Sequence, residues 1–420
     1  MLDMNFLRDH ADDVRKSLVN RQKDSNLVTK VLDIDSGRKT LLTKVEDLRA
    51  SQNKLSKTIA GKPTSDQIST GTKIKSELKL LEEQLKFTDN ELLAVLEEIP
   101  NIPAEDVPVG KDDQDNVVIK TVGEPPKFTW QPLDHTDLGK KLDIIDIEKA
   151  AQLSGSRFGY YKNEAAVLEM ALMFYAFKKL ISKGFKGMVP PPMIKSATEW
   201  GCGYSSNKNL FGAYYSVPED DLVFISSSEH SVVPYHTNEI LELEKLPIKY
   251  VNYSPCFRRE AGTYGKDMKG MLRVHNFNKV EMNIFTLPDT KVSDAMCLEM
   301  LAIEEEILQE LELPYQVVKN CTGDLPQPNR RMYDINTWFP GQNQYRETNS
   351  CSNCTDYQAR RLNTRVKING KPEYVHILNA TVMSDRPLLA LLENNQQKDG
   401  SIKLPKVLWP FTGFETISPK

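Results

Sequence analysis

The first hundred residues carry apolar side chains at heptad spacing in two stretches. Within each stretch the pattern advances by alternating steps of four and three residues. The first stretch is Leu41, Val45, Leu48, Gln52, Leu55 and Ile59, and the second is Ile74, Leu78, Leu81, Leu85, Thr88, Leu92 and Val95. Such spacing puts one apolar stripe on each of two helices. Because the breaker-rich segment "GKPTSDQISTG" separates them, the pattern predicts an antiparallel coiled-coil hairpin, an arm over about 27–97.

The arm ends in the segment "IPNIPAEDVP", whose prolines cannot continue a helix. We therefore expect an N-terminal helical domain over 1–99, a linker over 100–120 and a second domain over 121–420. A chain of 420 residues is long enough for two or three domains.

Beyond the linker, short runs rich in β-branched and aromatic residues alternate with a few longer helical patterns. The expected strands are 222–226, 248–253, 273–285, 315–320, 332–339 and 374–382, and the expected helices are 164–183, 291–312 and 385–397. Strands in runs, with few βαβ alternations, predict an antiparallel sheet with helices packed on it. The fold class is therefore α+β.

Composition and charge exclude several classes of protein. The net charge is -4, so no basic field covers the whole protein, and any nucleic-acid binding must come from a local patch. Six cysteines in 420 residues do not form a disulfide framework. The N-terminus has no apolar signal segment, and no stretch is long enough to span a membrane. We expect a cytoplasmic protein with no membrane or DNA partner.

The far end of the predicted arm carries an excess of positive charge. Between Arg38 and Lys79 there are ten Lys or Arg and four Asp or Glu. This charge fits a solvated coiled-coil face, and it also fits an arm that follows the phosphates of a nucleic acid. The periodicity alone does not decide between the two.

A charged loop follows one of the predicted strands, in "SPCFRREAGTYGKDMKGMLRVHNFNKVEM" at 254–282. The chain has no GxxxxGK[ST] segment and no GxGxxG that opens a helix, so nucleotide phosphates would need another site. Arg258, Arg273 and Arg386 are candidates, since a guanidinium matches phosphate oxygens and keeps its charge. Phe277 could stack a base.

Carboxylates provide a second set of candidates near the predicted strands, together with polar neighbours. They are Glu229, Glu260, Glu281 and Glu347, with Ser227, Ser350, Asn379 and Thr381. If these groups gather, they could bind an ammonium group and a divalent metal. An arginine–phosphate site beside such a pocket suits activation of an amino acid with ATP. The pair Cys351 and Cys354 is a weak zinc signal, because a structural site needs four ligands.

Several segments, in order along the chain, resemble the seryl-tRNA synthetases, which are class II aminoacyl-tRNA synthetases. They are "MLDMNFLRDHADDVRKSL", "IPNIPAEDVPVGKDDQDN", "GEPPKF", "SGSRF", "CFRREAG", "YRETNSCSNCTDYQARR" and "LENNQQKDGSIKLPKVL". The resemblance implies a class II antiparallel catalytic domain and a serine–tRNA ligase. Such an enzyme forms seryl-adenylate from serine and ATP, then transfers the seryl group to serine tRNA, and in some hosts to selenocysteine tRNA.

The resemblance also implies roles for individual residues. Arg258 and Arg386 are the expected catalytic residues on the phosphates, and Glu347 with Ser350 would hold Mg²⁺. The expected ATP-binding residues are Arg258, Glu260, Arg273, Val274, Phe277, Glu347, Ser350 and Arg386. The expected serine-binding residues are Ser227, Glu229, Arg258, Glu281, Asn379 and Thr381.

For the macromolecular partners, the resemblance implies that the arm grasps the long variable arm of serine tRNA. The expected tRNA-binding residues are Arg49, Lys54, Lys57, Lys62, Lys73, Lys75, Lys79, Lys266 and Lys269. The segment "KGFKGMVPPPM" is similar to motif 1, the dimer-interface motif of class II enzymes, and implies a homodimer.

The chain departs from the family pattern in three places. Ser227-Ser228-Glu229 stands where Thr-Ala-Glu is usual, Asn379-Ala380-Thr381 where many relatives have Asn-Gly-Ser, and no glycine precedes Arg386 in "TVMSD". Two other functions fit a synthetase-like chain: a paralogue that loads an amino acid on a carrier protein, and a non-catalytic RNA-binding relative. The first is expected to lack the arm, and the second to have lost Arg258, Glu260, Glu347 or Arg386.

Overall fold

The chain forms two compact units in the computed structural model, Met1–Pro100 and Asn101–Lys420. The structure describes residues 1–59, 61–204, 214–260 and 270–419. Strand β1 (Val117–Val122) pairs with the main sheet of the second unit. The segment expected as a linker therefore contributes its last residues to that sheet, because Val117 to Lys120 lie in β1.

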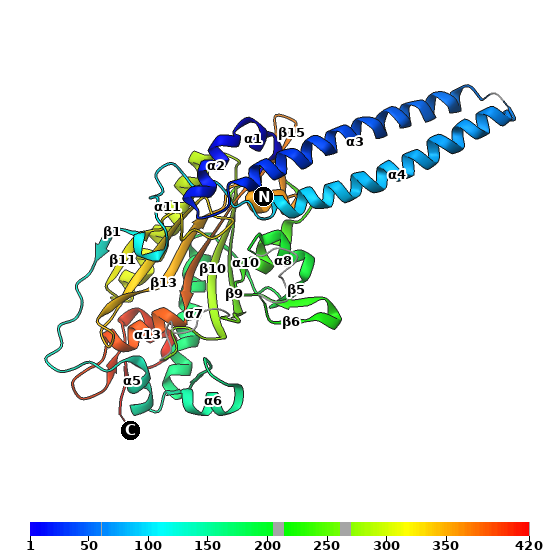
Figure 1. Cartoon of the computed structure of the whole chain (residues 1–420). Coiled ribbons are helices and arrows are strands. Elements are labelled where there is room, and N and C mark those ends of the chain that lie inside the picture. Colours follow the sequence, from blue (N-terminus) through cyan, green and yellow to red (C-terminus); the bar gives the residue numbers. More distant parts are fainter. Residues whose placement is uncertain (60, 205–213, 261–269, 420) are drawn as a thin grey trace. The chain divides into compact units, whose positions relative to one another are not determined.

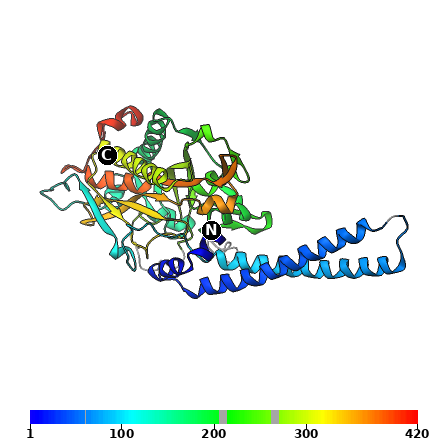
Figure 2. The same ribbon diagram turned by 90° about the horizontal axis from the view of Figure 1, so that it is seen from above.

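The N-terminal unit is helical. It consists of α1 (Met4–Asp9), α2 (Ala11–Asn20), α3 (Asn26–Lys57) and α4 (Ser65–Leu96). Helices α3 and α4 run side by side as a long hairpin in both views (Figure 1, Figure 2). The predicted hairpin is thus confirmed, but its turn is shorter than expected. Helix α4 begins at Ser65 because Thr64 and Gln67 form a capping box there.

An apolar seam joins the two long helices, as heptad spacing requires. Val45, Leu92 and Val95 are buried, and the other seam residues that lie in the two helices are half-buried. Two ion pairs cross the seam, Arg38 to Asp89 at 2.5 Å and Arg49 to Glu82 at 2.7 Å. Exposed pairs of this kind add little stability, so the apolar seam holds the arm together.

An eight-stranded sheet forms the centre of the second unit, in the order β1-β11-β12-β13-β16-β10-β9-β4. Every neighbouring pair is antiparallel except β4 with β9. The other strands of this sheet are β4 (Lys186–Met188), β9 (Ile248–Phe257), β10 (Asn276–Thr286), β11 (Tyr315–Lys319), β12 (Arg331–Phe339), β13 (Gln344–Asn353) and β16 (His376–Ser384). The predicted α+β class is confirmed.

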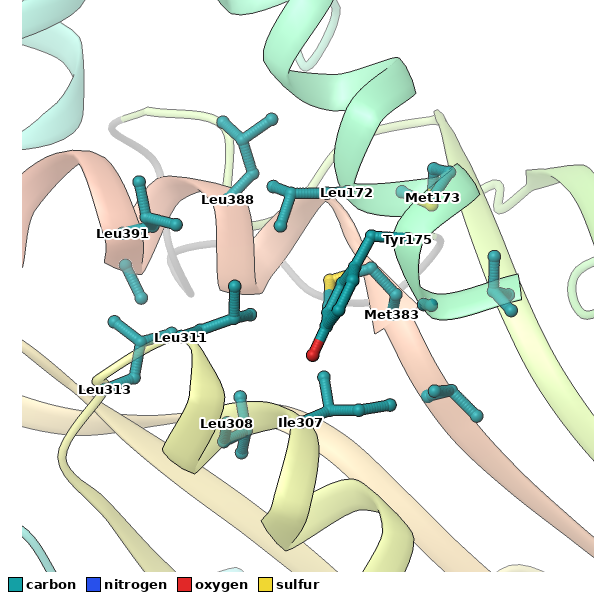
Figure 3. Close-up of a cluster of buried hydrophobic side chains, with 14 of the residues drawn as sticks. Leu172, Met173, Tyr175, Ile307, Leu308, Leu311, Leu313, Met383, Leu388 and Leu391 are labelled. Atoms are coloured by element: carbon teal, nitrogen blue, oxygen red, sulfur yellow. The ribbon is translucent and has the colours of Figure 1, made fainter. Parts of the chain in front are cut away.

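Three helices cover one face of this sheet: α7 (Asn163–Ser182), α11 (Thr290–Glu310) and α13 (Asp385–Asn394). Figure 3 shows Leu172 of α7, Leu308 of α11 and Leu388 of α13 converging with Met383 of β16. These side chains belong to one large buried apolar cluster. Burial of this size, at roughly 25 cal/mol per Å² of apolar area, dominates the stability of such a layer.

Residues of β10 and β16 alternate between the helix-covered face and the opposite face. Val280, Met282 and Ile284 join the apolar cluster, as do Leu378, Ala380 and Val382. Their neighbours Lys279, Glu281, Asn379 and Thr381 are polar and line a cavity on the other face. Period-two alternation thus places a buried polar row opposite the core.

Shorter elements complete the second unit. The helices are α5 (His135–Lys141), α6 (Ile147–Ser154), α8 (Ser196–Cys202), α10 (Glu229–Val232), α12 (Tyr357–Leu362) and α14 (Trp409–Thr412). The strands are β2 (Ile145–Asp146), β3 (Tyr160–Tyr161), β5 (Met193–Lys195), β6 (Ser216–Val217), β7 (Leu222–Phe224), β8 (Ile240–Leu241), β14 (Arg365–Ile368), β15 (Lys371–Tyr374), β17 (Ile402–Lys403) and β18 (Thr416–Ile417). Short 3₁₀ turns are η1 (Asp113–Asp115), η2 (Pro218–Asp220), η3 (Val233–His236), η4 (Leu243–Lys245) and η5 (Lys406–Leu408).

Three sequence predictions about strands were wrong in detail. The expected strand 273–285 begins only at Asn276, so Arg273 and Val274 precede it. The expected strand 374–382 is divided, because β15 ends at Tyr374 and β16 begins at His376. Strand β13, which carries Glu347 and Ser350, was not predicted at all, since its polar residues lack the apolar alternation of a strand.

Candidate active site

A cavity of about 250 Å³ lies on the polar face of the sheet and gathers the predicted site residues. Its lining includes Ser227, Glu229, Arg258, Glu260, Arg273, Val274, Phe277, Glu281, Glu347, Ser350, Asn379, Thr381 and Arg386. These are all the residues that the sequence analysis assigned to ATP, serine and Mg²⁺. They come from β10, β13 and β16, from the segments that follow β9 and precede β10, and from the starts of α10 and α13, so the fold brings together groups that are far apart in sequence.

Arg258 follows the last residue of β9 and is exposed toward the cavity. Its guanidinium lies 5.0 Å from the centre of the Phe277 ring, and its Nε donates a hydrogen bond to the Ser226 carbonyl at 3.3 Å. A cation over an aromatic face is attracted by the ring quadrupole. The Phe277 ring, which is expected to stack a base, is therefore already in contact with an arginine.

Glu260 and Arg273 are joined by an ion pair of 2.6 Å, from Arg273 Nη1 to a Glu260 carboxylate oxygen. Glu260 adopts a positive φ of 51°, which is uncommon for a residue with a side chain. The family resemblance implies a separate contact with ATP for each of these two residues. In the structure they contact each other.

Arg386 is the first-turn arginine of α13 and contacts two segments of chain. Its Nε donates to the Leu272 carbonyl at 3.1 Å, and its Nη1 donates to the Glu347 carbonyl at 2.9 Å and lies 3.2 Å from the Glu347 carboxylate. Desolvation in the cavity wall would raise the pKa of Glu347, but the charges of Arg386 and Arg258 outweigh that effect and lower the pKa. Glu347 is thus an ionised carboxylate facing the cavity.

Glu347 and Ser350 are the residues available for a divalent metal. Within residues 1–59, 61–204, 214–260 and 270–419, no group of three or more His, Cys, Asp or Glu side chains is arranged to hold a metal ion. Mg²⁺ needs no such cage, because it commonly takes one or two protein oxygens together with water and substrate phosphates. One ionised carboxylate and one hydroxyl on the same strand fit that kind of binding.

We call Arg258, Glu260, Arg273, Glu347 and Arg386 the arginine group. A second set, the acidic group, consists of Ser227, Ser228, Glu229, Lys279 and Glu281. All five members of the acidic group are buried. The arginine group is half-buried or exposed.

Glu281 is the centre of the acidic group. Its carboxylate accepts hydrogen bonds from the Ser227 hydroxyl at 3.0 and 2.8 Å, from the Glu229 amide at 3.1 Å and from the Ser228 hydroxyl. Lys279 forms an ion pair with it. Burial would raise the pKa of Glu281, but the charge of Lys279 and these donors outweigh it and lower the pKa.

Glu229 begins the short helix α10 and has fewer donors. Its carboxylate accepts hydrogen bonds from Gln358 Nε2 at 3.1 Å and from the Tyr204 hydroxyl. Burial raises the pKa of Glu229, and the nearby charge of Glu281 adds to that effect. Beside it, His230 Nδ1 lies 2.6 Å from a carboxylate oxygen of the buried Glu199. The unfilled acceptor capacity of Glu229 suits a bound ammonium group.

Asn379 and Thr381 reach the cavity from β16. Thr381 pairs with Glu281 across the strands, and Asn379 pairs with Asn283. The neighbouring β13 holds this strand through Asn349, whose Nδ2 donates to the Thr381 carbonyl at 2.8 Å and the Val382 carbonyl at 3.0 Å. The register of β10, β16 and β13 therefore fixes both polar side chains beside Glu281.

Among the cavity residues that were not predicted from the sequence, Lys279 and Asn349 contact the predicted site residues directly. Lys279 was visible in the segment "FNKVEM", where it alternates with apolar residues in the same way as Glu281, two positions away. A lysine on the polar side of a buried strand needs a partner, and Glu281 is the nearest acid on that side. Asn349 gave no comparable signal, because its role depends on strand pairing.

The cysteines that gave a weak zinc signal have different surroundings. Cys351 Sγ lies 3.6 Å from Cys297 Sγ on the helix-covered face of the sheet. Cys354 Sγ is 3.4 Å from Asn329 Oδ1. Both are buried free thiols.

On the arm, all seven of the expected tRNA-binding residues are exposed: Arg49, Lys54, Lys57, Lys62, Lys73, Lys75 and Lys79. Arg49 is paired with Glu82. The expected residues Lys266 and Lys269 lie outside the described residues. In the part of the chain that the structure describes, no helix is long and apolar enough to cross a membrane.

Two family models match the chain. The seryl-tRNA synthetase N-terminal domain matches residues 1–103, and the class II tRNA synthetase core domain (G, H, P, S and T) matches residues 215–395. The curated relatives include a serine–tRNA ligase of Thermobifida fusca, 40% identical over 100% of this chain and 99% of the relative. Another serine–tRNA ligase, from Borrelia recurrentis, is 40% identical over 100% of this chain and 100% of the relative.

Solved structures agree with this likeness. The crystal structure of seryl-tRNA synthetase from Pyrococcus horikoshii, complexed with ATP, has a TM-score of 0.92 and 38% identity, with 100% of each chain covered. The crystal structure of cytoplasmic serine–tRNA ligase from Naegleria fowleri, in complex with AMP, has a TM-score of 0.88 and 31% identity, with 100% of this chain and 99% of that chain covered.

Proposed function

Because the chain belongs to the seryl-tRNA synthetase family of class II aminoacyl-tRNA synthetases, we propose that its cavity activates serine with ATP and charges serine tRNA. The observation that carries the proposal is the gathering of every expected ATP and serine residue around one cavity of about 250 Å³. An arginine group beside a buried acidic group provides the two chemistries that the reaction needs, phosphate binding and ammonium binding.

In the first step, a serine carboxylate oxygen attacks the α-phosphorus of ATP, and pyrophosphate leaves. Arg258 contacts the carboxylate and the α-phosphate, while Arg386 and Arg273 contact the phosphates of the leaving group. These cations offset the negative charge that develops at phosphorus, and they are in place before the reaction. No covalent enzyme intermediate is needed, so positioning carries the catalysis.

The base of ATP stacks on Phe277, with Glu260 and Val274 beside it. Binding of ATP in this position must replace two contacts within the protein. The Arg258 guanidinium lies over Phe277, and Arg273 is paired with Glu260. Phosphate offers arginine a charge-assisted, bidentate contact, which favours the exchange even though the Glu260 side chain is only 9% exposed.

Glu347 and Ser350 would hold Mg²⁺ together with phosphate oxygens of ATP. When bound, the ion neutralises phosphate charge and orients the pyrophosphate group. The ionised state of Glu347 supports this assignment, since a protonated carboxyl would not act as a ligand.

Serine lies with its ammonium group at Ser227 and Glu229 and its hydroxyl at Glu281 and Thr381, with Asn379 alongside. A buried site that hydrogen-bonds the hydroxyl rejects alanine, because its own polar groups would stay unpaired. Threonine is excluded by the lack of room for its methyl group. Ser227 replaces the usual threonine with the same functional hydroxyl.

In the second step, a terminal ribose hydroxyl of serine tRNA attacks the carbonyl carbon of seryl-adenylate, and AMP leaves. The exposed lysines of the arm bind the phosphates of the long variable arm of that tRNA. Selenocysteine tRNA is a further substrate in hosts that have it. We place the enzyme in the cytoplasm, a compartment with which its buried free thiols are compatible.

The functional enzyme is a homodimer that uses one side of α7. Val167, Met170, Phe174 and Ile181 are large apolar residues of this helix, and all four are exposed. Their spacing of three, four and seven residues places them along one stripe, opposite the side of α7 that enters the core. A stripe of this kind marks an interaction surface, and the motif 1 resemblance of the following segment supports a second copy as the partner.

Amino-acid-dependent ATP–pyrophosphate exchange tests the proposal. The full chain is assayed without tRNA, with serine, threonine, alanine and glycine in separate reactions. We expect exchange with serine alone. Exchange with another amino acid would show that the departures at Ser227 and Thr381 changed the substrate, and a carrier-loading enzyme would then need testing. No exchange with or without tRNA would favour an RNA-binding relative.

A further inference from the structure

Lys279 is a buried charge inside the acidic group. Its side chain is 5% exposed, it lies on β10 two residues before Glu281, and both line the cavity. Its ammonium forms an ion pair with Glu281 and donates to the Ser227 hydroxyl at 3.2 Å. A lysine buried at this depth is retained only when its charge has a partner. The ion pair is therefore an integral part of the cavity floor.

Two carboxylates in this group could attract the ammonium of an amino acid. Glu229 and Glu281 are both nearly inaccessible to solvent, and each influences the charge of the other. An amino acid that placed its ammonium at Glu281 would leave the proposed ammonium position at Glu229 empty and displace the serine hydroxyl from its acceptor. Such binding would be unproductive, so the cavity needs a way to distinguish its two acids.

The lysine provides that distinction, because it forms an ion pair with Glu281 and acts on Glu229 only as a more distant charge. Glu281 has Lys279 and three other donors, whereas Glu229 has the side chains of Gln358 and Tyr204. A second cation bound directly to Glu281 would lie beside the Lys279 ammonium, where burial strengthens repulsion, and an ammonium at Glu229 meets this charge less closely. A neutral hydroxyl at Glu281 would not be repelled.

We propose that Lys279 is a positioning residue that sets serine specificity: it neutralises Glu281 and keeps that carboxylate as the hydroxyl acceptor, while the ammonium is directed to Glu229. The inference rests on the proposed function, since it takes serine to be the substrate. It adds a role that none of the residues expected from the sequence has, because Lys279 acts on the substrate through Glu281.

The test uses the full chain in serine-dependent ATP–pyrophosphate exchange. In Lys279→Met we expect kcat/KM for serine to fall roughly 100-fold, with the KM for ATP changed less than about twofold. The preference for serine over alanine should fall at least about tenfold. Lys279→Arg keeps the charge and should recover part of both losses. A purely structural role would raise the KM of both substrates and leave the preference unchanged.

The pH profile gives an independent readout. Glu281 is faced by Lys279 on its own strand, by Glu229 and His230 on α10, and by Cys256 on β9. Without Lys279 the burial of Glu281 is compensated only by its hydroxyl and amide donors, so its pKa rises, and the pKa of Glu229 rises as well because in wild type the Lys279 charge lowers that pKa too. In Lys279→Met, kcat/KM for serine should therefore gain a new decrease toward acidic pH that wild type lacks. The decrease should be smaller with alanine, which has an ammonium for Glu229 but no hydroxyl for Glu281.

The double variant Lys279→Met with Glu281→Gln removes both charges. It provides a second test if the single variant misfolds. It should fold even if Lys279→Met does not, because no buried charge is left unpaired. We expect it to be no more than about threefold less active with serine than Glu281→Gln alone, and to lack the acidic decrease. Additive losses, or a wild-type pH profile in Lys279→Met, would overturn the inference. If wild type showed no serine exchange, the proposed function would fail before Lys279 was tested.

Discussion

The arginine group and the acidic group of the cavity hold their charges in different ways. In the acidic group, buried Glu281 is surrounded by donors within hydrogen-bond distance and by Lys279. In the arginine group, oppositely charged side chains pair with each other. Arg386 pairs at 3.2 Å with Glu347, whose side chain is 51% exposed, and Arg273 pairs at 2.6 Å with Glu260, whose side chain is only 9% exposed. Buried pairs are expensive to break, whereas exposed pairs contribute about 0–1 kcal/mol.

The two groups are therefore suited to different tasks: the acidic group to selecting the amino acid, and the arginine group to binding an anionic ligand. The acidic group is preorganised and can discriminate between small amino acids, because any mismatch leaves a buried polar group unpaired. In the arginine group, the exposed pair of Arg386 with Glu347 is weak and can exchange partners when a large anionic ligand arrives, whereas the pair of Arg273 with the nearly buried Glu260 costs more to break. Substitutions in the two groups should therefore change different kinetic parameters.

The largest effect is expected for Arg386→Ala in the arginine group. Loss of a preorganised cation at the phosphates should lower kcat for serine-dependent exchange by about 10²–10³-fold. Arg386→Lys should be impaired less but should not restore full activity, because an ammonium cannot make a forked contact. Arg15→Ala, which removes an exposed pair with Asp12, serves as the matched control and should change nothing. A loss below tenfold in Arg386→Ala would contradict the assignment.

A second prediction separates the cavity from the arm. Replacing Lys73, Lys75 and Lys79 with alanine removes three exposed charges and leaves both groups of the cavity intact. Aminoacylation kcat/KM for serine tRNA should fall roughly tenfold or more at low salt and show a shallower salt dependence, because fewer phosphate contacts release fewer counterions. Exchange without tRNA should stay at the wild-type rate. Equal losses in both assays would mean that the variant is damaged elsewhere.

Phe277→Leu should have a smaller effect, confined to the nucleotide. Stacking of a base on an aromatic ring contributes about 1–3 kcal/mol, so the KM for ATP should rise about tenfold. Leucine keeps the apolar volume, and the KM for serine should not change. Steady-state exchange with ATP and serine varied in turn measures both. A parallel rise in both KM values would show that Phe277 positions the serine half as well.

The sequence predicted some parts of the molecule well for physical reasons. Heptad spacing defines the arm because a coiled-coil seam is a local pattern, and Leu41 to Val95 needed no distant contact to be recognised. The expected helix 164–183 differs from α7 by one residue at each end. In the same way, Val280, Met282 and Ile284 marked β10 by their alternation with polar residues.

Other parts depend on contacts between distant segments and could not be predicted. Strand β13 is stabilised by pairing with β12 and β16, so its polar sequence carried no strand signal. The pairing of Glu260 with Arg273 follows from the path of the chain between them. The grouping of the site residues came from the family resemblance, because sequence spacing alone could not place Arg386 beside Glu347.

The smallest predicted effect, a change in stability with pH, comes from comparing two buried carboxyls. Glu281 has several donors, whereas Asp385, the first residue of α13, has a buried carboxylate oxygen without a hydrogen-bond partner. Burial, together with the charge of Glu169, raises the pKa of Asp385 to about 8. Asp385 is therefore a neutral acid at pH 7, while Glu281 is charged.

A carboxyl whose folded pKa exceeds its unfolded value near 4 makes the folded state less stable as pH rises between those two values. Asp385→Asn removes this effect, so the variant should gain stability relative to wild type as pH rises from 5 to 8. Thermal unfolding should show a Tm difference that grows by about 2–4 °C over that range. Glu281→Gln should behave oppositely, losing stability at every pH in the range, because its carboxylate is already ionised and paired. A Tm difference for Asp385→Asn that is constant with pH would mean that Asp385 is ionised as well, and that donors are not what distinguishes the two acids.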